Sequence, residues 1–323
     1  MINLGILGTA DIAYNRFLPA VLKSPEFNVV GVAKHHTDGT ERVQRFTDTY
    51  NIRVFNSFEE LLAQPELDAV YLPIPPATHF YWAERVLNLG LHAYVEKPFT
   101  TNLRDTDTLL QLAEQKGLVV FENYMFQYHS QLDWLREQLA VGLIGELRLI
   151  RSSFSFPLRS SNDFRYKKDL GGGALLDAGG YVVRLACQLM KEPKLVGANL
   201  RYLPSFEVDM QGTIQLLASD GVPFQGYFCM DSFYQCSVEL IGSKGKLSTN
   251  RVFTAPPNYS PRWVLETQGE QKTFDLPADD HFFNAIRHFR SMIGNPEKQS
   301  NLRREIRQQA ILIEAIRNRG TEE

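Results

Sequence analysis

Two groups of residues in this chain have types and spacings that suit proton transfer. The first is Glu96-Lys97-Pro98, which directly follows an apolar run at residues 92–95. That run predicts a buried strand, so the two charged side chains would stand at its carboxyl end, facing a ligand crevice. The ammonium group of Lys97 can hydrogen-bond an oxygen that gains negative charge, and Pro98 restricts the backbone before it. In an arbitrary protein the same triplet would more often be a surface charge pair.

The second group is Asp177, Tyr181 and Arg184, within a helix predicted over residues 173–190. Asp177 and Tyr181 are four residues apart and Arg184 follows three residues later, so all three would share one helix face. A carboxylate and a phenol on one face can orient and donate protons around a polar substrate. The alternative is a purely structural role, in which the glycines form the turn before the helix and Tyr181 is a half-buried packing residue.

The beginning of the chain has a glycine loop of the kind that binds the pyrophosphate of a dinucleotide. A strand is predicted over residues 2–7 and a helix over residues 12–22. Gly8, Thr9, Ala10 and Asp11 lie between the strand and the helix, and Ile12 begins the helix. Gly8 permits the tight turn, and the free N–H groups at the helix start favour phosphate. Alanine stands at positions 10 and 13, so the fingerprint is degenerate and a plain strand-to-helix turn is the alternative.

The end of the second predicted strand, residues 29–33, indicates which dinucleotide would bind. Sites selective for NAD(H) usually place Asp or Glu there to bond the ribose 2′-hydroxyl. Here Lys34 and His35 follow the strand, and Asp38 comes only later. Basic side chains suit a 2′-phosphate, so the sequence favours NADP(H) over NAD(H). Solvated loop charges are the alternative for either residue.

The order of predicted elements gives the fold class. Strands and helices alternate through the first third, which predicts a parallel sheet with helices on both faces. After about residue 145 most elements are neighbouring strands, which favours an antiparallel sheet. We therefore expect an α/β protein with an N-terminal Rossmann dinucleotide-binding domain over residues 1–121. A C-terminal α/β domain with a large, mostly antiparallel open sheet would occupy residues 122–323, for substrate binding and oligomerisation.

Composition excludes several other classes. The 323 residues suit two domains, and 44% hydrophobic content excludes global disorder. The 34 basic and 37 acidic side chains give a net charge of −3 without basic blocks, which argues against nucleic-acid binding. Three cysteines and seven histidines lack disulfide or metal-ligand spacing, so no metal is expected. No apolar run is long enough for a membrane span and no signal-like start is present, so a cytoplasmic protein is expected.

Together these motifs resemble the Gfo/Idh/MocA family (glucose–fructose oxidoreductase and inositol dehydrogenase) over essentially the whole chain. The resemblance rests on residues 8–13, 71–79, 96–98, 122–129 and 171–181. Many members carry histidine where this chain has Tyr181. Tyrosine there is typical of the branch with glucose–fructose oxidoreductase, dihydrodiol dehydrogenases and certain deoxysugar ketoreductases. Five further segments look like those of the nucleotide-sugar 3-ketoreductases of deoxysugar biosynthesis: residues 122–123, 163–166, 208–212, 239–247 and 251–257.

The resemblance implies roles for individual residues. Lys97 and Tyr181 would assist proton transfer, and Asp177 would hold the sugar hydroxyls or Lys97. The implied cofactor contacts are Gly8, Thr9, Ala10, Asp11, Ile12, Lys34, His35, Pro73, His79, Glu96, Lys97 and Arg165. The implied substrate contacts are Asn123, His129, Asp177, Tyr181 and Arg184.

The implied reaction is NADPH-dependent reduction of a keto group, expected at C3, of a nucleotide-activated (deoxy)sugar. One alternative is an NAD(P)-dependent dehydrogenase of free sugars or dihydrodiols. Another is a noncatalytic NADP-binding sensor, although a sensor needs only the phosphate loop and not Lys97, Asp177 and Tyr181 together. The resemblance also implies a homodimer or homotetramer that associates through the C-terminal sheet.

Overall fold

The computed structural model describes residues 1–320, which fold into two compact units. Unit 1 comprises residues 1–123 and 282–307, and unit 2 comprises residues 124–281 and 308–320. The expected boundary after residue 121 lies close to the first division. The membership of residues 282–307 in unit 1 is not apparent from the sequence.

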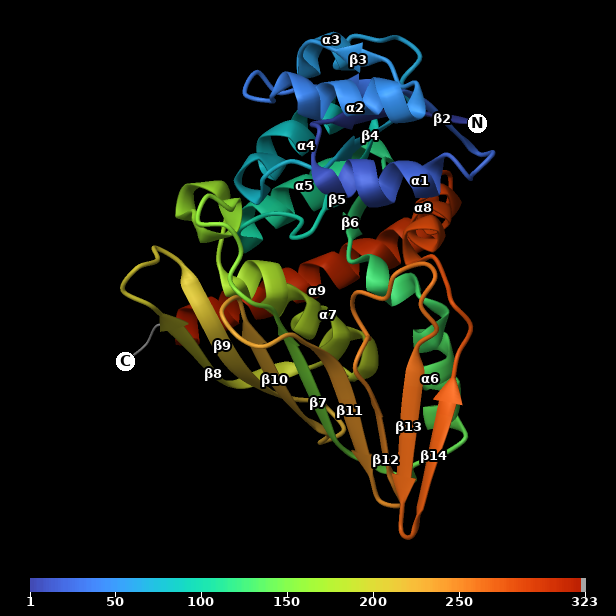
Figure 1. Cartoon of the computed structure of the whole chain (residues 1–323), viewed down its shortest axis with the longest axis vertical. Helices are drawn as coiled ribbons and strands as arrows, with labels where there is room; N and C mark the ends of the chain where they lie inside the picture. The colour runs from blue at the N-terminus through green and yellow to red at the C-terminus, as the bar shows by residue number, and fades with distance from the viewer. Residues whose placement is uncertain (321–323) are drawn as a thin grey trace. The chain divides into compact units, whose positions relative to one another are not determined.

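Unit 1 is built on a six-stranded parallel sheet in the order β3-β2-β1-β4-β5-β6 (Figure 1). The strands are β1 (Ile2–Leu7), β2 (Phe27–Ala33), β3 (Val54–Phe55), β4 (Ala69–Leu72), β5 (His92–Glu96) and β6 (Val120–Asn123). All four residues of β4 are buried, as expected for a parallel sheet covered on both faces. The strand order reverses between β1 and β4, and ligands of such sheets bind beyond the carboxyl ends of the strands at that point.

Helical segments connect these strands. They are η1 (Ala13–Phe17, a π-helical turn), α1 (Leu18–Val21), α2 (Thr40–Tyr50), α3 (Phe58–Leu62), η2 (Pro76–Thr78), α4 (His79–Asn88) and α5 (Leu103–Lys116). Two further helices, α8 (His281–Met292) and α9 (Pro296–Gly320), come much later in the chain and connect no strands of this sheet. Helix α5 begins where the Asn102 side chain accepts a hydrogen bond from the backbone N–H of Asp105, and ends at Gly117 in the left-handed conformation. No helix within residues 1–320 combines the length and apolar character that a membrane crossing requires.

Unit 2 contains an eight-stranded sheet in the order β14-β13-β12-β11-β7-β10-β9-β8. The strands are β7 (Leu147–Ser155), β8 (Lys194–Tyr202), β9 (Asp209–Leu217), β10 (Pro223–Cys229), β11 (Gln235–Gly242), β12 (Lys246–Thr249), β13 (Arg262–Thr267) and β14 (Glu270–Asp275). Every pairing is antiparallel except that of β7 with β10. The expectation of a large, mostly antiparallel sheet is therefore confirmed.

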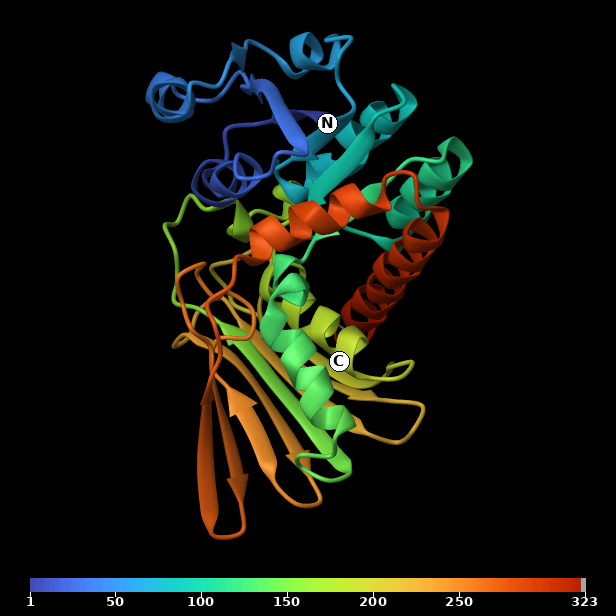
Figure 2. The same ribbon diagram turned by 90° about the vertical axis from the view of Figure 1, so that its right-hand side faces the viewer.

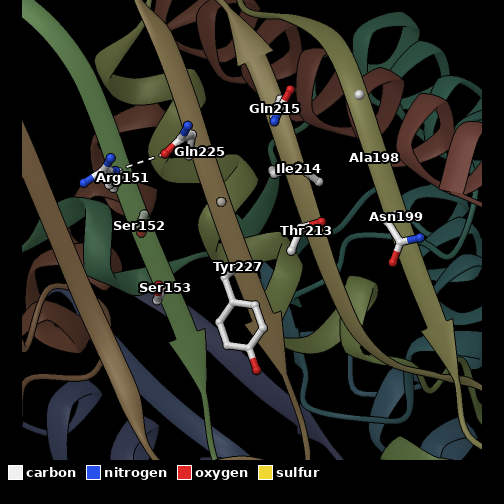
Figure 3. Close-up of a pocket in the computed structure, with 12 residues that line it drawn as sticks. Arg151, Ser152, Ser153, Ala198, Asn199, Thr213, Ile214, Gln215, Gln225 and Tyr227 are labelled. Carbon is white, nitrogen blue, oxygen red and sulfur yellow. Dashed lines mark hydrogen bonds between the residues drawn. The ribbon is translucent and has the colours of Figure 1, made fainter.

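Unit 2 also contains the helical segments η3 (Met125–Tyr128), α6 (Ser130–Ala140), η4 (Phe164–Tyr166), η5 (Lys168–Leu170), η6 (Leu175–Gly179, a π-helical turn) and α7 (Gly180–Leu189). Figure 2 shows α6 and α7 lying along the sheet on the same side. The turn η6 approaches β10 closely, since a Cβ atom at Gly179 would lie 3.2 Å from the Phe228 ring. The opposite face carries alternate residues of the same strands, and none of the helices within residues 1–320 lies in front of it in the part that Figure 3 draws.

Candidate active site

The glycine loop at the end of β1 has the conformation that the sequence predicts. Gly8 has a φ of 103°, which a residue with a Cβ rarely adopts, and its added Cβ would lie 3.1 Å from the side chain of Ile74. Pro73 and Ile74 follow β4, so the glycine loop and this second loop meet at the switch point of the sheet. The backbone then enters the helical segment 11–21.

Thr9 supplies a test of whether this loop fits a dinucleotide. Its side chain is 2% exposed, and its Oγ1 atom has no hydrogen-bond partner among the described residues. A buried hydroxyl without a partner costs free energy unless a ligand satisfies it, so the loop fits the phosphates of a nicotinamide cofactor.

Two arginines of α2 approach the same loop. Arg42 and Arg45 both donate hydrogen bonds to the carbonyl oxygen of Thr9, at 3.0 and 3.1 Å. Arg45 also forms an ion pair with Asp11 at 2.7 Å. The sequence analysis did not include these arginines, although their spacing of three residues on a predicted helix could have indicated a basic face. They concentrate positive charge beside the expected phosphate site.

Lys34 and His35 follow β2, as expected. Lys34 is half-buried and forms no ion pair within residues 1–320, so its ammonium group is available to a 2′-phosphate. The backbone N–H of His35 donates to the carboxylate of Asp38 at 2.8 Å, and its ring contacts Thr37. Asp38 therefore stabilises the loop around His35.

His79 connects two loops of unit 1. Its Nδ1 atom lies 2.8 Å from the carbonyl oxygen of Pro98, and its Nε2 atom lies 2.8 Å from that of Ile74. The imidazole is fully buried, and this burial lowers its pKa. Because both ring nitrogens face backbone carbonyls, His79 would act on a cofactor through the loops that it holds.

A hydrogen-bond network also fixes Glu96, next to Lys97. Oε1 of Glu96 accepts from the Tyr71 hydroxyl at 2.6 Å and from the Asn123 amide at 2.7 Å. Burial raises the pKa of Glu96, and these two hydrogen bonds oppose that effect. The Asn123 amide oxygen accepts in turn from Tyr94. Asn123 is fully buried, so its contacts place it as a support for Glu96.

The other side of the Lys97-Pro98 segment is held as well. The Glu122 carboxylate accepts a hydrogen bond from the backbone N–H of Phe99 at 2.8 Å. The segment is thus fixed by His79 and by Glu122, which lie on separate elements. Such support is what a precisely placed functional side chain needs.

In unit 2, Tyr181 lies in an aromatic enclosure. Its side chain is 6% exposed, and its hydroxyl lies 3.6 Å from the sulfur of Met125. Four rings surround it, with centroid distances of 5.0–5.8 Å: Tyr124, Phe126, Phe154 and Phe253. Rings from three separate segments therefore fix the position of this phenol.

Asp177 lies one helical turn before Tyr181 and is paired with Arg165. The Nε atom of Arg165 donates to Oδ2 of Asp177 at 2.8 Å, and its NH1 atom lies 3.1 Å from Asp163. Burial lowers the pKa of Arg165, but the two carboxylates outweigh burial and raise it. The sequence analysis names Asp177 and Arg165 separately, and the structure joins them.

Asp209 of β9 supports the start of this helix. Its Oδ2 atom accepts from the backbone N–H of Leu175 at 2.6 Å. Gly173 has a φ of 119°, and a Cβ atom there would lie 2.4 Å from the Asp209 carboxylate. Glycine is required at this position because the carboxylate occupies the space. Asp209 was not among the residues expected from sequence.

Two further expected residues are buried in unit 2. The Arg184 guanidinium is fully buried and lies over the Tyr124 ring, 5.1 Å from its centroid. His129 is also fully buried, and its Nδ1 atom accepts from the backbone N–H of Gln131 at the start of α6. Burial lowers the pKa of His129, and nearby Asp279 opposes this. Arg184 thus packs on one ring of the Tyr181 enclosure, whereas His129 fixes the start of α6.

A depression of about 500 Å³ lies on the uncovered face of the unit 2 sheet (Figure 3). Arg151, Asn199, Thr213, Gln225 and Tyr227 are among its lining residues, and Arg151 donates to Gln225. None of the residues expected in the active site lines it. This depression is therefore separate from the candidate site.

The fold and these residues define a two-unit protein with a Rossmann dinucleotide-binding unit and a second α/β unit that carries the tyrosine helix. Two family descriptions match the chain: "Oxidoreductase family, NAD-binding Rossmann fold" over residues 2–124 and "GFO/IDH/MocA C-terminal domain" over residues 133–248. The chain belongs to the Gfo/Idh/MocA oxidoreductase family.

Relatives match nearly the whole chain. A dTDP-3,4-didehydro-2,6-dideoxy-alpha-D-glucose 3-reductase of Actinomadura kijaniata is 37% identical, covering 98% of this chain and 95% of the relative. A reductase of the same name from Streptomyces violaceoruber is 36% identical, covering 98% and 94%. Among solved structures, the chain is similar to the A. kijaniata 3-ketoreductase KijD10 in complex with NADP and TDP-benzene. The two share 36% sequence identity with a TM-score of 0.93, and the match covers 98% of this chain and 97% of KijD10.

Proposed function

We propose that this protein is an NADPH-dependent reductase of a keto group, at C3, of a nucleotide-activated deoxysugar. The observation that carries the proposal is similarity over 98% of the chain to reductases of that name. The orphaned hydroxyl of Thr9, the basic Lys34 and the two arginines at the glycine loop support NADP(H) as cofactor. A cytoplasmic location is part of the same proposal.

The chain's own residues account for the proton in this reaction. NADPH, when bound, supplies a hydride to the carbonyl carbon. The carbonyl oxygen then needs one proton to become a hydroxyl, and we assign its stabilisation to the ammonium group of Lys97 and the phenol of Tyr181. Asp177 orients the substrate hydroxyls or Lys97, and Arg165 holds the Asp177 carboxylate in position.

Solved variants of the relative change residues of the same two types. Structures of KijD10 exist in which one tyrosine is replaced by phenylalanine, or one lysine by alanine or glutamate. A lysine and a tyrosine are the two residues to which we assign proton transfer here.

The test is NADPH oxidation across nucleotide-linked 3- and 4-ketosugars, with free aldoses as a further arm. We expect the highest kcat/KM for a 3-ketosugar that carries the nucleotide. Comparable rates with free aldoses would favour a free-sugar dehydrogenase, and tight NADPH binding without any turnover would favour a sensor.

The Lys97→Ala variant tests the site itself. We expect kcat to fall by about 100-fold or more, because a positioned acid contributes that much, while the Kd for NADPH stays near wild type. Lys116→Ala, at the end of α5, is the matched control. An unchanged kcat in Lys97→Ala would remove Lys97 from the mechanism.

We further propose that the uncovered sheet face joins copies of this chain as a homodimer or homotetramer. Its lining residues are mainly uncharged, and several are exposed in the single chain, among them Thr213 and Gln225, while Tyr227 is half-buried. Light scattering should give a multiple of the chain mass, and Tyr227→Arg should reduce it. A monomeric wild type would contradict this part of the proposal.

A further inference from the structure

Three loops of unit 2 leave the sheet at the same end of its strands. They follow β7, join β10 to β11 over residues 230–234, and join β12 to β13 over residues 250–261. The parallel strands β7 and β10 both finish at this end of the sheet. β11 runs antiparallel to β7 and begins there, and β12 runs antiparallel to β11 and finishes there. Side chains from these loops therefore meet at one end of the sheet.

Arg251, in the third loop, is a cation without a carboxylate partner. Its NH1 atom donates to the Tyr234 hydroxyl at 2.9 Å, and its guanidinium lies over the rings of Tyr234 and Tyr259, at 4.9 and 5.8 Å. It forms no ion pair with any residue of the described chain. Its carbonyl oxygen accepts from Gln131, which fixes the backbone. A planar guanidinium held in this way matches the oxygens of a phosphate.

The same loop reaches the Tyr181 enclosure. Phe253, two residues after Arg251, is fully buried, and its ring lies 5.7 Å from that of Tyr181 and 5.2 Å from that of Phe154. Two residues of chain span about 7 Å at most. The backbone of Arg251 therefore lies within about 7 Å of the backbone of Phe253, whose ring packs against Tyr181.

Phe233 adds an aromatic surface in the second of these loops, one residue before Tyr234. Its side chain is 83% exposed, although its carbonyl oxygen accepts from the Ser155 hydroxyl at 2.8 Å. The backbone is therefore anchored while the ring faces outward. The next residue, Tyr234, is the one that holds Arg251. An exposed ring one residue from the tyrosine that holds a guanidinium suits a nucleobase, whose flat face stacks on aromatic side chains.

We propose that Arg251 binds the diphosphate of the nucleotide-activated sugar and that Phe233 stacks on its base. The inference rests on the proposed function and names the part of unit 2 that recognises the nucleotide. Tyr234 is a positioning residue, because it acts through the guanidinium that it holds. The sequence run 251–257 thereby gains a role in selecting nucleotide-linked over free sugars.

The test is calorimetric titration of thymidine diphosphate into the protein saturated with NADPH. We expect Arg251→Ala to raise the Kd for thymidine diphosphate by about 10–100-fold, the loss of a charge-assisted hydrogen bond. Phe233→Ala should raise it by about 5–100-fold, the loss of one stacked base. Arg251→Lys keeps the positive charge but lacks the planar guanidinium, so its Kd for thymidine diphosphate should lie between those of wild type and Arg251→Ala. This variant also tests the site if Arg251→Ala does not fold.

Arg85→Ala is the matched control. Arg85 donates to a tyrosine hydroxyl and lies over two aromatic rings, as Arg251 does, but it belongs to α4 of unit 1. Its removal should leave the Kd for thymidine diphosphate unchanged. The Kd for NADPH should stay near wild type in every variant, because a rise there with unchanged thymidine diphosphate binding would assign Arg251 to the cofactor and overturn the proposal.

The remaining outcomes separate this inference from the proposed function. Wild-type protein that binds no thymidine diphosphate, or folded variants that bind it as tightly as wild type, would overturn the nucleotide site even if ketosugars are reduced. Weaker thymidine diphosphate binding in Arg251→Ala and Phe233→Ala would support the site even if no ketosugar in the panel is turned over.

Discussion

Arg165 and Asp177 are joined by a 2.8 Å hydrogen bond from Nε to Oδ2, and the same guanidinium lies 3.1 Å from Asp163. The side chains of Arg165, Asp163 and Asp177 are 20%, 16% and 11% exposed. One cation thus neutralises two largely buried carboxylates, and one of them belongs to the helix of Tyr181. Arg165 couples the 163–166 turn to that helix.

Replacing this shared cation should destabilise the fold. Arg165→Met leaves two carboxylates with little solvent, and we expect the free energy of unfolding to fall by about 2–4 kcal/mol. Arg148→Met is the control, because Arg148 and its partner Glu146 are 61% and 76% exposed and should contribute about 0–1 kcal/mol. Urea denaturation of both variants measures the difference. Equal losses would show that the Arg165 pairs contribute no more than a surface pair.

The members of this ion-pair group show where sequence reasoning stops. Asp177 and Tyr181 are related by helical spacing, which a sequence displays directly. The pairing of Asp177 with Arg165 spans twelve residues and depends on the glycine turn at 171–173 that folds the chain back. The contact of Asp209 with Leu175 spans 34 residues and has no local pattern. Supports of this kind are visible only in three dimensions.

The fold shows the same division. The strand predicted over residues 2–7 matches the observed bounds, because it has a clear apolar pattern and ends at Gly8. Helix α6 was not predicted, since Leu132 and Leu135 are its only buried apolar residues. The short β3 and α3 were also missed. The division of unit 1 into two chain segments depends on packing between distant residues.

The Tyr181 hydroxyl can be removed without disturbing its enclosure. Tyr181→Phe keeps the ring among its four aromatic neighbours, so the melting temperature should stay close to wild type while kcat falls by about 100-fold. Tyr166→Phe is the control within the same unit, because its hydroxyl only accepts from the backbone N–H of Arg159. It should retain wild-type kcat. Steady-state kinetics would contradict the role of Tyr181 if both variants had the same kcat.

Lys34 should determine which cofactor is preferred. Wild type should have a higher kcat/KM with NADPH than with NADH, and Lys34→Glu should reduce this ratio by about 10-fold or more, because a carboxylate repels a 2′-phosphate and accepts from a 2′-hydroxyl. Lys116→Glu makes the same charge change away from β2 and should leave the ratio unaltered. Equal use of both cofactors by wild type would remove the argument from Lys34.

Asp209 should make the stability of this protein depend on pH. Burial raises the pKa of Asp209 to about 6, against an ordinary aspartate value of 3.8. Between these two values, the folded protein holds a proton that the unfolded chain releases. The contribution of Asp209 to stability is therefore greatest at low pH and falls as pH rises from about 4 to about 6. Above pH 6 the folded state bears the full cost of a buried carboxylate.

An amide at this position should remove that cost while it still accepts the hydrogen bond of Leu175. We expect Asp209→Asn to match wild type near pH 4 and to exceed its free energy of unfolding by about 1–3 kcal/mol at pH 8, because a shift of two pKa units corresponds to that amount. Asp220→Asn, in the exposed turn between β9 and β10, should show no pH-dependent gain. Urea denaturation at several pH values measures both variants. A gain of Asp209→Asn that is the same at pH 4 and pH 8 would mean that this carboxyl does not titrate differently in the folded and unfolded states.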